Sequence, residues 1–109
     1  MYYIYLMRCS DNSLYCGITT DLYRRFSEHT NKENPKGAKY THARKVISIA
    51  AAWQTEAGRS EASKLEAALK KLSKDKKETL CVSTERLYDF YKGEELFVCV
   101  SCEKTDDKK

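Results

Sequence analysis

Arg25 and His29 are the first pair of side chains in this 109-residue chain whose types and spacing could do chemistry. Because they lie four residues apart, they project from one face of a helix. A guanidinium offers a bidentate donor fork to phosphate oxygens, and an imidazole can move a proton near neutral pH. The competing interpretation is an ordinary polar helix flank, in which Asp21 and Glu28 pair with Arg24 and Arg25. The spacing alone leaves both interpretations open.

Glu66 is a carboxylate at the border of an apolar helical stripe. The stripe consists of apolar residues at spacings of three, four and three, namely Ala62, Leu65, Leu69 and Leu72. At about 100° per residue, Glu66 falls roughly 40° from Ala62, on the rim of the stripe and not on the solvent face. A carboxylate in that position needs a cation, a metal ion or a proton as its partner. The competing interpretation is a surface-edge glutamate that pairs with Lys70, four residues later.

Tyr5 and Tyr15 are two of the eight tyrosines of the chain and lie ten residues apart across a predicted turn. Side chains alternate along a strand, so these two share a face of a hairpin only if the loop has an odd number of residues. Amphipathic packing, with each hydroxyl reaching water, explains most of the tyrosines equally well.

The basic residues are unevenly distributed. Residues 1–79 hold 15 Lys and Arg against 9 Asp and Glu, whereas residues 80–109 hold 5 against 7. The lysines of residues 64–77 could hold a phosphate backbone, although a solvated helix face explains most of them. Lys39 and Arg44 precede the third predicted strand and are better placed to reach a ligand near Arg25, provided that their loop lies beside that helix. A basic body weakly favours a polyanionic partner.

The elements that would carry these residues follow from alternation and periodicity. We expect a hairpin of Tyr2–Arg8 and Leu14–Thr19, followed by a helix capped by Thr20 or Asp21 and ending near residues 30–31. A central strand follows at Val46–Ala50, inside the segment Ala43–Trp53. We then expect a helix capped by Ser60 and running through Leu72, and a short helix or continuation at Lys74–Thr79. Beyond Leu80, Leu96–Val100 is either an edge strand or a packing segment. The order β-β-α-β-α-α predicts an α+β fold, a three-stranded antiparallel sheet flanked by helices.

Composition narrows the class of protein. Apolar residues make up 41% and charged residues 33% of the chain, with a mean hydropathy of −0.69. These values favour a soluble globule and exclude a disordered, collagen-like or membrane-channel chain. No signal peptide is apparent, and five cysteines, an odd number, favour free thiols in the cytoplasm. Cys99 and Cys102 form one CxxC, which is either a metal or redox pair or two small apolar residues.

Taken together and in this order, the segments resemble the GIY-YIG nuclease family in its small stand-alone bacterial form. Tyr3-Ile4-Tyr5 stands where that family has Gly-Ile-Tyr, and Tyr15-Cys16-Gly17 stands for Tyr-Ile-Gly. Residues 21–29 resemble the first helix of the family, residues 60–72 the helix that carries its glutamate, and residues 37–41 a loop of the stand-alone and junction-resolving members. The match covers about residues 2–80. The chain departs from the family at Tyr3 and Cys16, and has no clear match to an asparagine that some members use.

The resemblance implies a role for each matching residue. Tyr5 and Tyr15 match the motif tyrosines near the scissile phosphate, Arg25 the essential arginine, His29 a histidine of some branches, and Glu66 the single metal ligand. It implies an endonuclease that hydrolyses phosphodiester bonds in DNA, with Mg²⁺ or Mn²⁺ held by Glu66 and charge on phosphorus neutralised by Arg25. Whether Tyr5, Tyr15 or His29 orients or deprotonates the attacking water is left open.

The same reasoning gives expectations for partners and organisation. We expect Lys39, Arg44 and Lys70 to bind nucleic acid. A stand-alone domain has few residues with which to grip DNA tightly, so we expect branched or single-stranded DNA as substrate, an accessory protein, and a monomer or weak dimer. The competing function is a nucleic-acid-binding module of the same fold with little or no turnover. We divide the chain into a nuclease-like domain (1–80), an extension packed on it (81–102) and a disordered tail (103–109).

Overall fold

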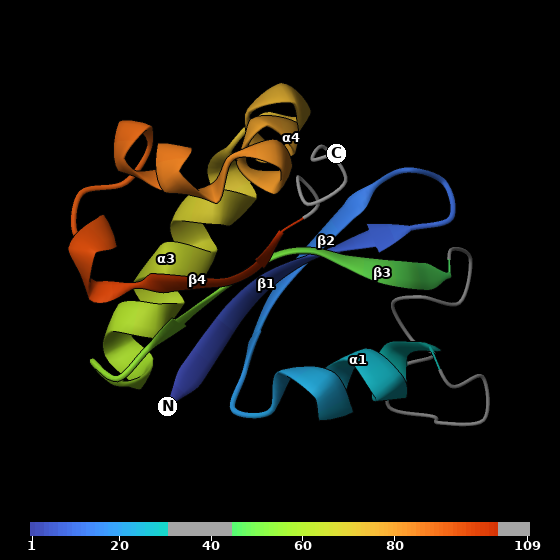
Figure 1. Cartoon of the computed structure of the whole chain (residues 1–109), viewed down its shortest axis with the longest axis horizontal. Coiled ribbons are helices and arrows are strands. Elements are labelled where there is room, and N and C mark those ends of the chain that lie inside the picture. Colours follow the sequence, from blue (N-terminus) through green and yellow to red (C-terminus); the bar gives the residue numbers. More distant parts are fainter. Residues whose placement is uncertain (31–44, 103–109) are drawn as a thin grey trace, which may run out of the picture.

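A computed structural model of the protein describes residues 1–30 and 45–102 and has an α+β fold (Figure 1). The elements, in chain order, are β1 (Tyr2–Cys9), β2 (Leu14–Thr19), α1 (Leu22–Thr30), β3 (Val46–Thr55), α3 (Arg59–Lys71), α4 (Lys74–Val82), the 3₁₀ helices η1 (Thr84–Asp89) and η2 (Glu94–Leu96), and β4 (Val98–Cys102). The four strands form one antiparallel sheet in the order β2-β1-β3-β4. The prediction of a three-stranded sheet is therefore wrong by one strand, because β4 pairs with β3 at the edge opposite β2.

The β1–β2 hairpin closes through a short loop that fixes the register. The amide of Cys9 donates to Ser13 O (2.9 Å), and Asn12 adopts a positive φ of 71°, a left-handed conformation that asparagine tolerates. Residues 10–12 therefore form the loop, an odd number. Tyr5 pairs with Gly17 and Met7 pairs with Tyr15. The condition for the two tyrosines to share a face of the sheet is met.

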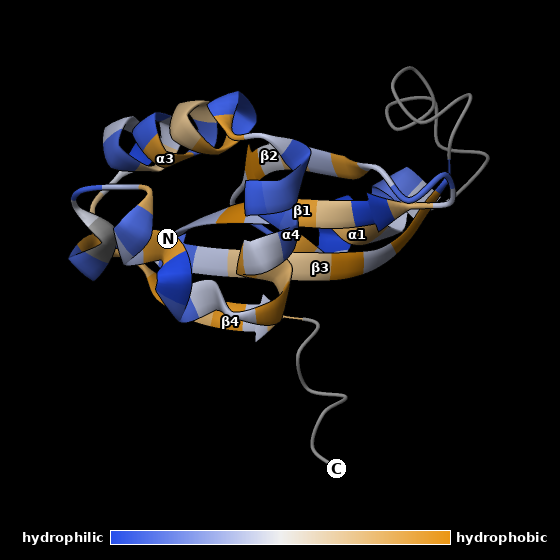
Figure 2. Ribbon diagram, turned by 90° about the horizontal axis from the view of Figure 1, so that it is seen from above, coloured by the Kyte–Doolittle hydropathy of each residue, from blue (hydrophilic) through white to orange (hydrophobic). Residues whose placement is uncertain are grey.

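Both faces of the sheet are covered, as Figure 1 shows: α1 lies on one side, and α3 with α4 on the other. Two apolar clusters result. The cluster on the α3 side includes Ile4, Leu6, Trp53, Leu65 and Leu69, and the cluster on the α1 side includes Tyr5, Met7, Leu22 and Val46. Figure 2 shows apolar residues along the strands and polar ones on the outer surfaces of the helices. This two-sided burial explains why β3 is apolar at both alternating positions, and it confirms the prediction that β3 is central.

The helix ends agree with the sequence at two positions and differ at a third. The carboxylate of Asp21 accepts from the amide of Arg24 (3.1 Å), so Asp21 caps α1 as expected. Ser73 accepts from the amide of Lys76 (3.3 Å), which makes α4 a separate helix and not a continuation. The prediction that Ser60 caps α3 is wrong. The cap is Gly58, whose φ of 104° is accessible to glycine, and the helix starts at Arg59.

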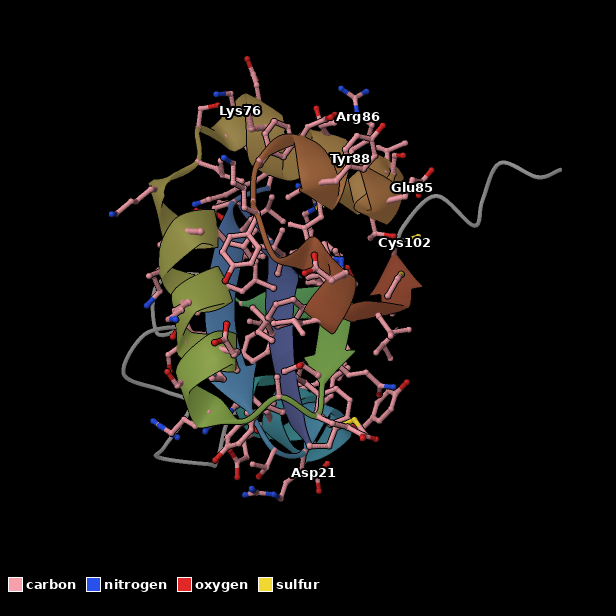
Figure 3. The ribbon with its side chains drawn as sticks, turned by 90° about the vertical axis from the view of Figure 1, so that its left-hand side faces the viewer. Asp21, Lys76, Glu85, Arg86, Tyr88 and Cys102 are labelled. Carbon is pink, nitrogen blue, oxygen red and sulfur yellow. The ribbon has the colours of Figure 1, made fainter. Side chains whose placement is uncertain are left out.

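The segment after α4 returns to the sheet. Leu87 and Phe97 are buried in the α3-side cluster, while Glu85, Arg86 and Tyr88 point away from the sheet on the outer side of η1 (Figure 3). Of the two predictions for Leu96–Val100, the edge strand is confirmed, shifted to Val98–Cys102. The proposed boundary at residue 80 falls inside α4, and the division into domain and extension stays a prediction. The predicted disordered tail, 103–109, lies outside the described residues.

Two further observations concern the state of the cysteines and the presence of membrane-spanning helices. All five cysteines are free thiols. In the described ranges 1–30 and 45–102, no helix has the length and apolar character needed to cross a membrane.

Candidate active site

Tyr5 and Tyr15 stand next to each other on the face of the sheet that α1 covers. Their rings meet edge to face, with centroids 6.1 Å apart and an interplanar angle of 72°. Tyr5 is buried, with 2% of its surface exposed, and its ring lies over the backbone of Gly17 on the neighbouring strand. A Cβ at position 17 would stand 2.5 Å from Cζ of Tyr5 and nearer still to its hydroxyl oxygen. The absent side chain of Gly17 is what allows Tyr5 its position.

His29 and Arg25 reach this pair from α1. The imidazole of His29 packs edge to face on Tyr15, with centroids 4.8 Å apart, and is 7% exposed. Nη1 of Arg25 lies 3.3 Å from Oε1 of Glu28, so the predicted helix-flank pairing is present as well. Nε of Arg25 and both ring nitrogens of His29 are buried, and none of them has a hydrogen-bond partner within the described part of the chain. The structure thus brings Tyr5, Tyr15, Arg25 and His29 together, and among the described residues Arg25 and His29 keep hydrogen-bonding nitrogens that are not used.

The pKa values of Tyr5 and His29 indicate which of the two side chains carries a proton at neutral pH. Burial raises the pKa of Tyr5 above its ordinary value; Tyr15 adds to this effect and the positive charge of Arg25 opposes it. Burial lowers the pKa of His29 below 6.5, and the charge of Arg25 lowers it further. At neutral pH, Tyr5 is therefore protonated and can donate a hydrogen bond, whereas His29 is neutral and can accept a proton.

Glu66 lies in the middle of α3, where helix and sheet meet. Its side chain is 20% exposed, on the rim of the buried stripe, as the helical wheel predicts. Nζ of Lys70 is 3.3 Å from Oε2 of Glu66, which is the competing pairing considered from the sequence. The Cys16 thiol donates to the backbone carbonyl of Glu66 (Sγ–O 3.8 Å), and burial, with the nearby charge of Glu66, raises the pKa of Cys16 to about 12. Cys16 therefore joins β2 to α3 as an un-ionised thiol.

The two groups of residues lie on opposite faces of the sheet, and both contact the edge strand β2. Tyr15 and Cys16 are consecutive on β2, so Tyr15 faces α1 and Cys16 faces α3. Tyr15 packs against His29 of α1, and Cys16 donates to the backbone carbonyl of Glu66 in α3. In the described residues, no hydrogen bond or ion pair joins Glu66 directly to Tyr5, Arg25 or His29. β2 is thus the strand that contacts both groups, through Tyr15 on one face and Cys16 on the other.

Comparison with known proteins bears on this arrangement. A family model described as the GIY-YIG catalytic domain matches residues 1–79. The chain belongs to the GIY-YIG family.

Relatives within the GIY-YIG family resemble the chain over most of its length. A UPF0213 protein of Desulfotalea psychrophila is 41% identical over 85 residues, which are 78% of this chain and 74% of that protein. A UPF0213 protein of Cupriavidus necator is 44% identical over 80 residues, 73% of this chain and 83% of that protein. A solution NMR structure of a UPF0213 protein from Bacillus halodurans is 41% identical and covers 73% of this chain and 82% of its own, with a TM-score of 0.45. These relatives are small stand-alone GIY-YIG proteins, and the family implies a nuclease-like fold.

The residues of this GIY-YIG protein can be tested for their fit to the divalent metal that the family generally uses. The carboxylate of Glu66 is reachable by solvent and has one charged partner, Lys70. Within residues 1–30 and 45–102, no group of three or more His, Cys, Asp and Glu side chains could jointly hold a metal ion. A single carboxylate suits Mg²⁺ or Mn²⁺, which keep several waters, and does not suit a closed zinc site. Glu66 therefore fits a largely hydrated ion.

Of the three residues predicted to bind nucleic acid, Lys70 lies in the described part of the chain. Lys70 is on α3 beside Glu66, whereas Lys39 and Arg44 lie outside the described residues. Sequence reasoning missed two contributions: Gly17 gives Tyr5 its space, and Cys16 touches the backbone of Glu66. The signal for both was the tripeptide Tyr15-Cys16-Gly17, in which alternation places the first and third residues on one face and the second on the other.

Proposed function

We propose that this GIY-YIG protein is a metal-dependent endonuclease that hydrolyses phosphodiester bonds in DNA. One observation supports it above the others: Tyr15 of the edge strand β2 packs against Tyr5 and His29 on one face of the sheet, while its neighbour Cys16 contacts the backbone of Glu66 on the other. The buried nitrogens of Arg25 and His29 without partners in the described residues fit a site built for a ligand.

Arg25 is the residue that would bind the scissile phosphate. Its guanidinium is one-third exposed and keeps donors beyond the one engaged by Glu28. A guanidinium fork matches two phosphate oxygens and stabilises the charge that builds on them in the transition state. Loss of one such donor from an enclosed site typically costs about 10²–10³-fold in rate.

The attacking water needs an orienting group and a proton acceptor. In this proposal Tyr5, which keeps its proton because burial raises its pKa, holds the water by hydrogen bonding. His29, neutral because burial and Arg25 lower its pKa, accepts the proton. Tyr15 lies between the two rings and fixes their relative position. Of the three groups that the sequence leaves open, we thus propose Tyr5 for orienting the water and His29 for accepting its proton.

Glu66 would hold the divalent ion, Mg²⁺ or Mn²⁺, through one carboxylate. Such an ion supplies charge stabilisation at the non-bridging and leaving oxygens of a phosphodiester. Glu66 is held in place by its helix and by the Cys16 thiol that donates to its backbone carbonyl. Lys70 and, outside the described residues, Lys39 and Arg44 are the proposed contacts to the DNA backbone. Branched and single-stranded DNA, with or without an accessory protein, are the proposed substrates.

The test compares two site variants with two matched neighbours. Arg25→Ala and Glu66→Gln should abolish Mg²⁺- or Mn²⁺-dependent cleavage of labelled branched, duplex and single-stranded DNA, with circular dichroism and unfolding curves unchanged. Arg24→Ala, an exposed arginine on the same helix, and Glu61→Gln, another lysine-paired glutamate on α3, should cleave as the wild type does. Full cleavage by either folded site variant would overturn the proposal.

A non-catalytic DNA-binding module is the second candidate. One observation favours it: Glu66 and Arg25 are already engaged by Lys70 and Glu28. Such a module would give a salt-sensitive shift of DNA in a gel and no products at any concentration of Mg²⁺ or Mn²⁺. Metal-dependent products lost in Glu66→Gln would exclude it.

A further inference from the structure

The carboxylate of Glu66 is occupied by a cation from its own helix. Nζ of Lys70 lies 3.3 Å from Oε2, one helical turn away. Glu66 is 20% exposed, whereas Lys70 is 58% exposed. The carboxylate is therefore fixed at the rim of the core, and the lysine reaches it from solvent on a flexible stem.

We propose that Lys70 is the resident counter-ion of Glu66, which a divalent ion displaces and which then binds a phosphate of the DNA. This inference rests on the proposed function, because it takes Glu66 as the metal-holding residue. Lys70 would thus have two successive partners: the carboxylate of Glu66 in the metal-free protein, and the nucleic acid in the metal-bound protein.

The replacement of Lys70 by a divalent ion at Glu66 is expected from the charges of the two cations and from the length of the lysine side chain. A carboxylate oxygen that contacts an ammonium group cannot also give its full electron density to a metal ion, so the two cations compete. The pairing is exposed on the lysine side, and exposed ion pairs contribute little, so a divalent ion can replace it. The displaced ammonium stays tethered near β2, because Lys70 is one helical turn from Glu66, whose backbone carbonyl accepts from Cys16 of that strand. β2 is the edge strand at which the proposed scissile phosphate would lie.

Two other lysines provide controls that separate this exchange from general electrostatics. The positive charge of Lys77, like that of Lys70, lowers the pKa of the Cys16 thiol. In the described residues, no ion pair joins Lys77 to Glu66. Lys64 pairs with Glu61 on the same helix, at 3.5 Å. Lys77→Gln removes a nearby charge without freeing Glu66, and Lys64→Gln removes a comparable helical ion pair elsewhere.

The first experiment measures Mn²⁺ binding to the full chain without DNA, by counting free Mn²⁺ with electron paramagnetic resonance. Lys70→Gln should bind Mn²⁺ about two- to fivefold more tightly than the wild type, the effect expected when an exposed ion pair is removed. Lys77→Gln and Lys64→Gln should each change the affinity less than twofold, on the order of the screened charge effect alone. Equal tightening in Lys77→Gln, or no tightening in Lys70→Gln, would overturn the exchange.

Glu66→Gln separates this inference from the function on which it rests. If Glu66→Gln weakens Mn²⁺ binding while Lys70→Gln leaves it unchanged, only the exchange fails. If Glu66→Gln and the wild type bind Mn²⁺ equally, Glu66 is not the ligand, and both the metal assignment and the exchange fail.

The second experiment follows the lysine itself. In the wild type, titration with Mg²⁺ should shift the ε-methylene NMR signal of Lys70, and in Glu66→Gln it should not. Binding of a single-stranded oligonucleotide with cleavage-resistant phosphorothioate linkages should then weaken about two- to fivefold in Lys70→Gln with Mg²⁺ present, and less without it. A Lys70 signal that ignores bound Mg²⁺, or an equal loss of DNA affinity in both conditions, would refute the exchange.

Discussion

Replacing Gly17 with alanine tests whether the backbone beneath Tyr5 must be free of a side chain. The added Cβ would stand 2.5 Å from Cζ and 3.0 Å from Cε1 of Tyr5. Carbon atoms in contact are ordinarily about 3.5–4.0 Å apart, so the ring must move by roughly 1 Å. Tyr5 is 2% exposed and is flanked on its other side by Ala52, its partner on β3, so little space is available for that movement.

The expected cost can be worked out from this overlap. Overpacking a buried site typically costs about 1–3 kcal/mol of unfolding free energy. The sign of the change in unfolding free energy is informative, because alanine in a strand is otherwise more favourable than glycine by roughly 0.5–1 kcal/mol. Displacing the Tyr5 hydroxyl by about 1 Å should also reduce cleavage on the order of 10²-fold, since a small misplacement in a catalytic site has that effect.

A double-mutant cycle in urea measures the steric effect without relying on activity. We expect Gly17→Ala to destabilise the wild type by about 1–3 kcal/mol, and to cost less than roughly 0.5 kcal/mol in a Tyr5→Leu background, where the ring is absent. An equal cost in both backgrounds would show that the strain lies in the β2 backbone. Unchanged stability and cleavage in the single variant would refute the whole argument for Gly17.

Three further predictions concern protonation and thiols. Glu78 accepts two hydrogen bonds from Arg8, which lower its pKa from 4.5 to about 2, so its contribution is complete above pH 4.5 and is lost as the pH falls toward 2. Because Glu78 is about one-third exposed, we expect Glu78→Gln to cost roughly 1–2 kcal/mol in neutral urea unfolding, with the difference vanishing in acid; a constant difference would contradict this. The lowered pKa of His29 means that the unfolded chain binds a proton first, so stability should fall as the pH drops below 6.5, and His29→Phe should flatten that fall in pH-dependent melting curves. A thiol reagent should modify the exposed Cys99 in the native protein and reach Cys16 only on unfolding; rapid native labelling of Cys16 would disprove its burial.

Local rules were sufficient for the first half of the fold. The alternation in β1 and β2 and the polar loop between them predict the hairpin, and the odd loop length fixes which tyrosines share a face. The spacing of Arg25 and His29 and the cap at Asp21 predict α1. Each of these features depends on residues within about one turn or one hairpin of each other, which is why a sequence read locally can give them.

The fourth strand depends on a contact that local patterns do not encode. The strand β4 has only five residues, of which 98–100 are exposed and 101–102 are half-buried, so its short sequence does not distinguish a strand from a packing segment. What places them is the free edge of β3 together with the burial of Phe97 and Leu87 beside Trp53. The predicted cap of α3 was wrong because side-chain preference alone was considered. Ser60 has a side chain suited to capping, but the positive φ of Gly58 sets the turn two residues earlier.

The candidate site is assembled across the sheet and not on one side of it. Side-chain alternation sends Tyr15 and Cys16 of β2 to opposite faces, and α1 and α3 cover those faces separately. If the strand that carries Tyr15 and Cys16 were an inner strand, neighbouring strands on both sides would keep the groups on its two faces apart. At the edge, where β2 has a single neighbour in the described sheet, groups from both faces share the same solvent. Helical spacing could locate Glu66 and Arg25 on their own helices. In the proposed function, the position of β2 at the edge is what would let a carboxylate on one face and a guanidinium on the other act on one phosphate.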